Sequence, residues 1–448
     1  MAGSEGKGGA EGRGGFATSV PPRAARFNTF TGDARGPRRY TDRTHRPGAD
    51  MPAPDLLAPL AGLRVAFLTH YTELYGANLS LLNLLDGLVR AGVRPHVVAP
   101  EGGDLLDVLA ARGIPAAVVP FEWWVSQTRT VLGAATRILK NLRHVRAIAA
   151  QVRRWGCELV YSNSSVFAAG GLAAAELDLP HLWHLREFGR RDYDLKPDLG
   201  VRLSRLGFRT ADATIFVSHA LRRAFLGRSV PANSHVIYNG VAREAEFDDR
   251  RRAAEAVRGR VQPVTFVLVG RFRESKGQHV AIEAFARIID RFPESRLLLV
   301  GGSGQTGQQA YFEQCQALAT QLRVADRIQF WGYIPDPERA FLAADVALMC
   351  SRNEAMGRVT AEAMSACRPV IGFDGGGTSE LIETGRTGML YRGGADELAA
   401  CMATYAAAPE LVRDHGDAGW HLARRRHSTE AYVAQVQEVI GSVVQAGG

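Results

Sequence analysis

The sequence has no long apolar run and few cysteines. No apolar stretch approaches the about 18 residues that a membrane-spanning helix needs, so we expect no such helix. The five cysteines are scattered, odd in number and never spaced as C-x-x-C. This pattern argues against a disulfide framework and a structural zinc site, and it fits free thiols in a reducing cytoplasm. They are Cys157, Cys315, Cys350, Cys367 and Cys401.

Lysine is also rare. Only four of the 54 basic residues are lysines, namely Lys7, Lys140, Lys196 and Lys276. A basic position taken at random would therefore almost always be Arg, so a Lys inside a motif is informative. The net charge is +8, and residues 1–50, with nine basic and five acidic side chains, carry half of it. The rest of the chain is nearly neutral, and we expect no nucleic-acid partner.

The chain pattern predicts a tail and two domains. Residues 1–55 are rich in Gly, Pro, Ala and Arg without apolar periodicity, so we expect a disordered tail and no secretory signal. The 448 residues exceed what one core usually fills. From Leu63 strands and helices alternate, which is typical of an α/β fold with parallel sheets. Charged residues from Arg243 to Arg260 interrupt this pattern, and we place the domain boundary there.

The most informative segment runs from Cys350 to Leu381. Its pattern predicts a strand, a polar turn, a helix over about Gly357 to Ala366, a second strand and a Gly-rich turn. Glu354 lies in the turn and Glu362 about one turn inside the helix, so both carboxylates can line the helix mouth. Free amides at Met356 to Arg358 suit a phosphate, and carboxylates beside it suit sugar hydroxyl groups. A phosphate that carries sugars at both ends is a nucleotide sugar.

These residues, EAMGRVTAEAM followed by Arg-Pro-Val and GGGTSEL, resemble the E-x7-E signature of retaining glycosyltransferases of family 4. That family has the GT-B fold, two Rossmann-like domains facing each other across a donor-binding cleft. The resemblance implies that Glu354 faces the donor sugar as a catalytic residue and that Glu362 binds the ribose. Two positions differ from the family pattern, since Cys367 replaces a Gly and Met356 an aromatic residue. The resemblance further implies Gly357 and Arg358 on the diphosphate, and Ala355, Met356 and Glu380 beside the donor sugar.

The start of the second domain extends this resemblance. Its Gly-Arg and Lys-Gly steps imply that Arg271 and Lys276 bind the diphosphate, the guanidinium through two oxygens and the ammonium as a point charge. The turn after RIQFWG implies Ile334 at the nucleobase. Residues 302–307 also read G-x-G-x-x-G, which alone suggests a dinucleotide fingerprint. Asp326 precedes the next strand and does not end it, which disfavours nicotinamide chemistry.

The first domain supplies weaker signals. Gly76 matches a family loop that approaches the diphosphate, although a plain turn fits equally well. The resemblance implies that His184 contacts the donor sugar or the acceptor as a second catalytic residue, while a structural role is the alternative. Arg186 and Glu187 follow it as acceptor candidates. Trp123 and Trp124 are also acceptor candidates, because adjacent indoles in a loop can stack on a sugar or plug the core.

Two further segments carry open interpretations. The helix predicted over Val131 to Trp155 has an apolar stripe with many arginines around it, which is typical of a core-facing helix and also compatible with an anionic membrane face. Asp192 and Asp194 form a D-x-D in a loop. No strand directly precedes them, so we interpret them as solvated charges and expect no metal ion.

The sequence therefore predicts a GT-B enzyme. We expect an acceptor domain over residues 60–245, a donor domain over 260–430 and a last helix over 430–448 that crosses back. The enzyme would move a sugar from a UDP or GDP donor, without a cofactor, to a carbohydrate, lipid-linked or small-molecule acceptor. We expect it in the cytoplasm, with peripheral membrane contact left open. The alternatives are a nucleotide-sugar epimerase or sugar phosphorylase of the same fold, and a non-catalytic module that binds sugar nucleotides or anionic surfaces.

Overall fold

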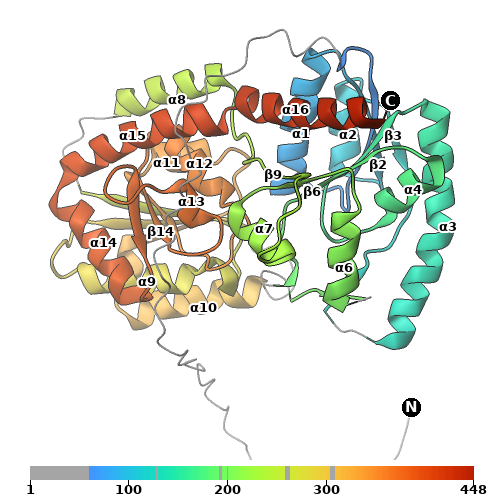
Figure 1. Cartoon of the computed structure of the whole chain (residues 1–448). Coiled ribbons are helices and arrows are strands. Elements are labelled where there is room, and N and C mark those ends of the chain that lie inside the picture. Colours follow the sequence, from blue (N-terminus) through green and yellow to red (C-terminus); the bar gives the residue numbers. More distant parts are fainter. Residues whose placement is uncertain are drawn as a thin grey trace, which may run out of the picture. The chain divides into compact units, whose positions relative to one another are not determined.

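Two separate parallel sheets form the framework of the chain (Figure 1). The computed structural model describes residues 60–127, 130–190, 194–198, 200–257, 263–302 and 308–447. Within these residues no helix is both long and apolar enough to span a bilayer. The alternation of strands and helices thus gives the two-sheet α/β architecture that the sequence predicts.

The first sheet has the strand order β3-β2-β1-β5-β6-β8-β9, and every neighbouring pair is parallel. Its central strands are buried on both faces, as their continuous apolar sequences require. A two-stranded antiparallel ribbon of β4 (Val125–Ser126) and β7 (Lys196–Pro197) lies outside it. The seven strands are β1 (Arg64–Leu68), β2 (Arg94–Ala99), β3 (Ala116–Val118), β5 (Leu159–Ser162), β6 (His181–Leu185), β8 (Ala213–Phe216) and β9 (Ser234–Val236).

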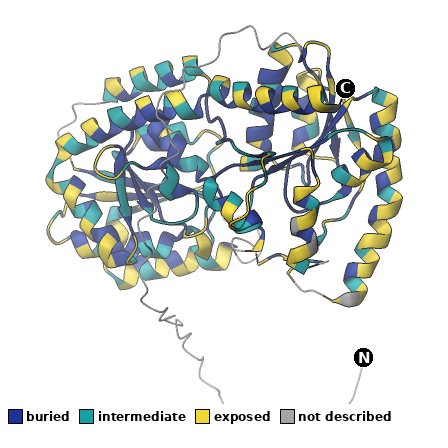
Figure 2. Cartoon of the chain, viewed as in Figure 1, coloured by how far each residue is buried: buried dark blue, intermediate teal, exposed yellow. Residues whose placement is uncertain are grey.

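Helices connect these parallel strands and cover the sheet (Figure 2). Thr130 caps the long α3 through its side-chain oxygen, which accepts a hydrogen bond from Gly133 N, and Gly156 ends it in the left-handed conformation. The helices are α1 (Gly76–Arg90), α2 (Asp104–Ala111), α3 (Val131–Trp155), α4 (Ala169–Leu177), α6 (Gly200–Arg209) and α7 (His219–Leu226).

The second sheet has the order β12-β11-β10-β13-β14-β15, again fully parallel. Its strands are β10 (Thr265–Val269), β11 (Arg296–Val300), β12 (Ile328–Trp331), β13 (Val346–Met349), β14 (Val370–Phe373) and β15 (Gly388–Tyr391). Its helices are η2 (Glu274–Lys276), α9 (Gln278–Ile288), α10 (Gln308–Gln321), η3 (Ala325–Arg327), α11 (Glu338–Leu342), α12 (Arg358–Ser365), α13 (Thr378–Leu381), α14 (Ala395–Ala407) and α15 (Pro409–His427).

The charged segment after β9 is a helix and not the break that the sequence suggested. Helix α8 (Glu244–Val257) buries Phe247 and Ala254, two positions seven residues apart on one face. It packs against α11, α12 and α15 of the second domain. Two buried apolar side chains are enough to hold this charged helix, because the neighbouring helices supply the rest of the core. A sequence pattern does not reveal such neighbours. The exact domain boundary stays a prediction.

The last helix, α16 (Thr429–Gly447), packs on the first domain beside α1 (Figure 1). Its buried side chains Tyr432, Val436 and Ile440 belong to the core cluster that includes β1 and α1. Gly87 lets the two helices approach closely, because a Cβ atom there would overlap the side chain of Val433. The first domain is therefore built from two parts of the chain, one before and one after the second domain.

Candidate active site

The mouth of α12 lies at the carboxyl end of β13, where parallel sheets commonly place ligands. Gly357 is its N-cap and has φ +88°, and a Cβ atom there would lie 2.9 Å from Thr378 Oγ1. The positive φ and the lack of room for a Cβ atom both require glycine at this position. The amides that begin this helix form the positive end of its dipole, as the sequence predicts for a phosphate site.

The Gly-rich turn packs directly against the turn that carries Glu354. Gly377 N donates to Glu354 O at 2.8 Å. A Cβ atom on Gly376 would overlap the carbonyl of Glu354, and one on Gly377 the carbonyl of Ala355. These glycines thus allow two backbone segments to touch, which is a packing role that the sequence reading did not identify.

Lys276 and Glu354 form an ion pair. Lys276 Nζ lies 2.5 Å from Glu354 Oε1, and the two side chains are 33% and 18% exposed. Burial alone would raise the pKa of Glu354, but the charge and the hydrogen bond of Lys276 outweigh it and lower the pKa below its ordinary value. The structure therefore brings together the predicted diphosphate cation and the predicted donor-sugar carboxylate.

Arg271 reaches across to the first domain. Its guanidinium carbon lies 4.5 Å from the centroid of the Tyr75 ring, a cation–π contact. Tyr75 immediately precedes Gly76, the first residue of α1. The loop of Arg271 is held by Gln278, whose side-chain amide donates to the carbonyls of Gly270 and Arg271 at 3.3 and 3.0 Å. Arg271 of the second domain thus lies against Tyr75, the residue before Gly76 of the first domain.

Arg358 binds protein groups through its side chain. Its Nε donates to Glu362 Oε1 at 2.7 Å, and Nη1 donates to Ser80 Oγ at 3.1 Å and to Gly240 O at 3.0 Å. The predicted diphosphate contact of Arg358 is left to its backbone amide. Glu362 keeps further lone pairs for hydroxyl groups and is held in place by this arginine.

Glu380 contacts the first domain, and its place beside the donor sugar stays a prediction. Its carboxylate accepts hydrogen bonds from His219 N at 2.8 Å, Ala220 N at 2.6 Å and the Tyr238 hydroxyl at 2.8 Å. His219 and Ala220 begin α7, so Glu380 caps that helix. A sequence motif cannot show this contact because the partners lie about 140 to 160 positions away.

Three smaller predicted donor-site residues are buried or half-buried in the core. Ala355 and Met356 are 9% and 3% exposed, and Met356 Sδ lies 3.2 Å from Asn239 N. Ile334 follows β12 and packs partly buried against the same cluster. Their contribution to a ligand would come mainly from backbone atoms. Most of the G-x-G-x-x-G motif, residues 303–307, lies outside the described residues.

His184 has no exposed surface in this structure, and its contact with a substrate stays a prediction. Its Nδ1 lies 2.5 Å from the Tyr161 hydroxyl and 3.3 Å from Arg186 Nη2. Burial, and then the charge of Arg186, lower the pKa of His184 well below its ordinary value. His184 is buried because it lies within β6, whereas residues after the end of a strand reach the edge of the sheet.

Arg186 and Glu187 follow the end of β6 and have different surroundings. Arg186 is 7% exposed and donates to Asn163, Asn239 and Tyr432. Glu187 accepts hydrogen bonds from the hydroxyl groups of Ser164 and Ser165 at 2.6 and 2.7 Å. Burial raises the pKa of Glu187, although these hydrogen bonds oppose the shift.

The two adjacent tryptophans lie in different surroundings. Trp124 stacks on Trp183 with centroids 5.6 Å apart and donates from Nε1 to Ser165 O, so it packs in the core. Trp123 is 37% exposed and donates to His70 O. Of this pair, Trp123 is the more exposed and therefore the better candidate for contact with an acceptor.

The D-x-D is only partly described. Asp194 is exposed and lies 3.7 Å from Lys196, while Asp192 lies outside the described residues. Within the described part of the chain, no three His, Cys, Asp or Glu side chains are placed to hold a metal ion.

A cavity of about 330 Å³ lies between α7 and the Gly-rich turn, next to Glu380. Residues of both domains line it, namely Ala220, Arg223, Ala224, Gly375, Gly376 and Ser379. It therefore lies at the contact between the two domains.

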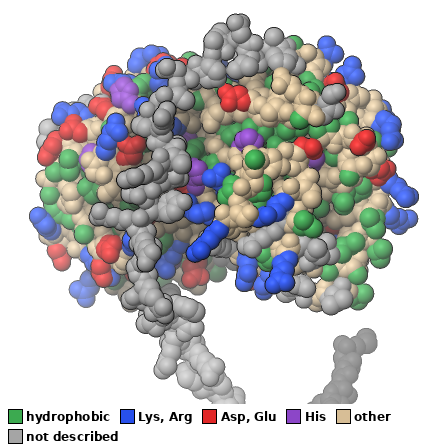
Figure 3. Space-filling model, viewed as in Figure 1, with side chains coloured by type: hydrophobic (Ala, Val, Ile, Leu, Met, Phe, Trp, Pro, Cys, Tyr) green, Lys and Arg blue, Asp and Glu red, His purple; other side chains and the backbone are tan. Residues whose placement is uncertain are grey.

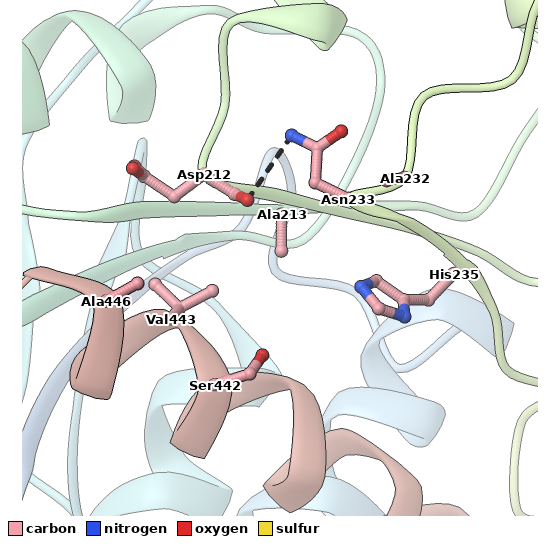
Figure 4. A pocket seen from close by; sticks show the side chains of 8 residues that line it. All are labelled: Asp212, Ala213, Ala232, Asn233, His235, Ser442, Val443 and Ala446. Atoms are coloured by element: carbon pink, nitrogen blue, oxygen red, sulfur yellow. Dashed lines mark hydrogen bonds between the residues drawn. The ribbon is translucent and has the colours of Figure 1, made fainter.

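A second cavity of about 290 Å³ lies between β8, β9 and α16 (Figure 4). Its polar groups serve the fold, since Asn233 Nδ2 donates to the carbonyls of Ala211 and Asp212, and the Asp212 carboxylate accepts from His181 N. It is lined by none of the predicted site residues.

Comparison with solved structures supports the fold. The fold is similar to that of HepE from Anabaena, crystallised with UDP, with a TM-score of 0.70 and 23% identity over 85% of this chain and 100% of that one. HepE was also crystallised with UDP-glucose. Two facing parallel-sheet domains of this kind form a GT-B fold, as the sequence predicts.

The family follows from two matches. Residues 75–245 match the model of Glycosyltransferase Family 4, and residues 249–425 match that of glycosyl transferases group 1. The chain belongs to these group 1, family 4 glycosyltransferases, and the resemblance drawn from the E-x7-E segment is confirmed at the level of the family. The roles of the individual residues stay predictions.

Two curated relatives carry the same name, D-inositol 3-phosphate glycosyltransferase. The one from Kribbella flavida is 31% identical over 227 residues, which is 46% of this chain and 53% of the relative. The one from Streptomyces griseus is 27% identical over 448 residues, which is 91% of each. The chain thus spans about half the length of the first relative.

Proposed function

We propose that this protein transfers a sugar from a nucleotide diphosphate donor to an acceptor hydroxyl group, with retention of configuration at the anomeric carbon. The observation that carries the proposal is the Lys276–Glu354 pair beside the mouth of α12. A cation for the leaving phosphate and a carboxylate for a donor hydroxyl lie within one hydrogen bond of each other. The acceptor is a carbohydrate, a lipid-linked sugar or a small polyol, and the relatives' name supports testing inositol phosphates.

The residues around the mouth of α12 divide the binding of the donor between them. Arg271 and Lys276 neutralise the diphosphate, and the amides near Gly357 stabilise the charge that grows on it as the sugar leaves. Glu362 binds the ribose while Arg358 fixes its position. The complexes of HepE with UDP and UDP-glucose support uridine donors as the first to test.

Same-face attack is the route that fits the carboxylates. A double displacement needs a carboxylate free to attack the anomeric carbon. Glu354 is paired with Lys276, and Glu380 caps α7. We therefore assign Glu354 to a donor hydroxyl group, and the leaving diphosphate accepts the proton of the acceptor. His184 contacts Arg186 and Tyr161, and we propose that it helps to hold the sugar in register.

The test is the release of nucleotide diphosphate from a panel of UDP and GDP sugars, followed by NMR of the product. Glu354→Gln should lower turnover by orders of magnitude while nucleotide diphosphate binding survives. Glu313→Gln, at an exposed position of α10, serves as the matched control. A product with inverted anomeric configuration would overturn the retaining mechanism, and no release from any donor in the panel would overturn the donor class.

We also propose that α3 contacts an anionic membrane. Of the apolar stripe that the sequence predicts, Val145, Ala149 and Val152 are buried, whereas Leu142 is 55% exposed. Leu132 and Leu139, outside that stripe, are 80% and 64% exposed. Exposed basic residues alternate with these leucines, and Figures 2 and 3 show exposed and basic side chains along this outer edge. Exposed leucines among cations suit an interface of anionic lipids.

Vesicle flotation tests this contact. The protein should float with vesicles that contain phosphatidylglycerol and not with neutral ones, and the double variant Leu139→Ser, Leu142→Ser should lose the binding. Leu172→Ser, at an exposed position of α4, controls for loss of an exposed leucine elsewhere. Equal flotation of both variants would exclude α3 as the contact.

A further inference from the structure

Three polar side chains meet where neighbouring strands of the first sheet end. His70 follows β1, Asn163 follows β5 and Arg186 follows β6, and these three strands are adjacent in the sheet. The carboxyl ends of parallel strands share one edge of the sheet, where ligands commonly bind. His70, Asn163 and Arg186 are 7%, 0% and 7% exposed.

Arg186 is a buried cation whose hydrogen-bond partners are all neutral. Nε donates to Asn163 Oδ1 and Nη1 to Asn239 Oδ1, both at 2.5 Å, and Nη2 donates to the Tyr432 hydroxyl at 2.8 Å. Among the described residues, no Asp or Glu forms an ion pair with it. Glu187 comes next in the chain and its charge interacts with that of Arg186, but its carboxylate accepts hydrogen bonds from Ser164 and Ser165. A buried guanidinium without a directly bonded carboxylate is costly, so an anion bound to it would be favourable.

Two further donors of this cluster lack partners. Asn163 Nδ2 and His70 Nδ1 are buried polar atoms without a hydrogen bond. Burial, and then the charge of Arg186, lower the pKa of His70 to about 3, so its ring is neutral near pH 7 and can donate one hydrogen bond. A guanidinium, an amide N–H and an imidazole N–H together suit an anion.

We propose that Arg186, Asn163 and His70 bind an anionic group, a phosphate or a carboxylate, on the acceptor substrate. This inference rests on the proposed glycosyl transfer, because it assigns the donor diphosphate to Arg271 and Lys276 on the other sheet. The cluster adjoins the reaction centre through Asn239, whose side chain binds Arg186 and whose N–H contacts Met356 beside the mouth of α12. An acceptor held there by its charge would present a hydroxyl group to the donor sugar.

Inorganic phosphate is the probe, added to the full-length protein with UDP at saturation so that the donor site is filled. Calorimetric titration should detect phosphate binding to the wild-type protein, and Arg186→Gln should weaken it about tenfold or more. Arg296→Gln, at the exposed opposite end of the second sheet, should bind phosphate like the wild type. Absence of phosphate binding in the wild-type protein, or equal binding in Arg186→Gln, would overturn the proposal.

Asn163→Asp provides a second test that does not depend on losing a contact. It places a carboxylate beside Arg186 without changing the size of the side chain, so the missing counter-charge comes from the protein itself. We expect a higher Tm and lost phosphate binding in this variant. A lower Tm with phosphate binding retained would contradict the proposed site.

UDP affinity separates this proposal from the proposed function. Arg186→Gln should bind UDP within about twofold of the wild type, because the donor cations are elsewhere. A tenfold loss of UDP affinity would assign Arg186 to the donor and overturn the acceptor site. If the wild-type protein binds phosphate but neither UDP nor GDP, the donor assignment fails while the anion site stands.

Discussion

Arg358 Nη1 donates to Ser80 Oγ at 3.1 Å, which joins α12 of the second domain to α1 of the first. The same guanidinium holds Glu362 and the carbonyl of Gly240. The residue that positions the predicted ribose ligand is thus also a bridge between the domains. We therefore expect donor binding and the approach of the two domains to be coupled through this side chain.

Arg358→Ala should weaken UDP binding and lower the Tm, because it frees Glu362 and removes contacts to the first domain. The expected loss of affinity is about 1.5 to 3 kcal/mol, the range for hydrogen bonds to charged groups. Ser80→Ala removes one of these contacts and should cost less in both measurements. Calorimetry and thermal unfolding test this, and equal effects of the two variants would show that the Glu362 contact is unimportant.

Acid should remove the stabilisation that Lys276 gives to Glu354. The folded-state pKa of Glu354 lies below its ordinary value of 4.5, so the ionised carboxylate stabilises the fold above that pH. The contribution is lost as the pH falls through the folded-state pKa. The difference in Tm between wild type and Glu354→Gln should therefore shrink between about pH 6 and pH 3, and a constant difference would argue against the ion pair.

Glu380→Gln should destabilise the contact between the second domain and α7. A neutral amide accepts hydrogen bonds from His219 and Ala220 less well than a carboxylate at a helix N-terminus, and we expect a loss of about 0.5 to 2 kcal/mol in the free energy of unfolding. Combined with Tyr238→Phe, which removes a partner of the same carboxylate, the effects should be non-additive. Strict additivity in denaturant titrations would mean that Tyr238 and Glu380 do not interact.

Gly87→Ala should destabilise the protein although alanine favours helices. Replacing glycine by alanine in a helix stabilises it by about 1 kcal/mol, but here the overlap of the new methyl group with Val433 on α16 costs more than this gain. We expect a lower Tm that Val433→Ala restores in the double variant. A stabilised single variant would show that α1 and α16 can separate without cost.

Chelation should leave turnover intact. The proposed donor site uses Arg271, Lys276 and the amides of α12 in place of a metal ion. Activity measured with EDTA and with added manganese tests this directly. Loss of turnover with EDTA that manganese restores would make Asp192 and Asp194 metal-ligand candidates again.

The fold and the second-domain site were accessible from the sequence because their signals are local. Strand and helix periodicity gave both sheets, and the spacing of Glu354 and Glu362 with the turn glycines identified the mouth of α12. The contacts of Arg358 and Glu380 were not accessible, since their partners lie on the other domain. The burial of His184 was also not accessible, because a pattern places a strand but does not fix the residue at which it ends.

The passage of the chain between the domains has one further consequence. Val241 N donates to His427 O, and Thr429 N donates to Ala242 O at 2.7 Å. The segment that leaves the first domain is therefore hydrogen-bonded to the segment that returns to it. The second domain is in effect an insertion between two neighbouring points of the first. A chain cut before α16 would leave the apolar face of α1 uncovered, whereas a short graft from Val241 to Thr429 would keep the first domain whole and excise the donor half as a unit.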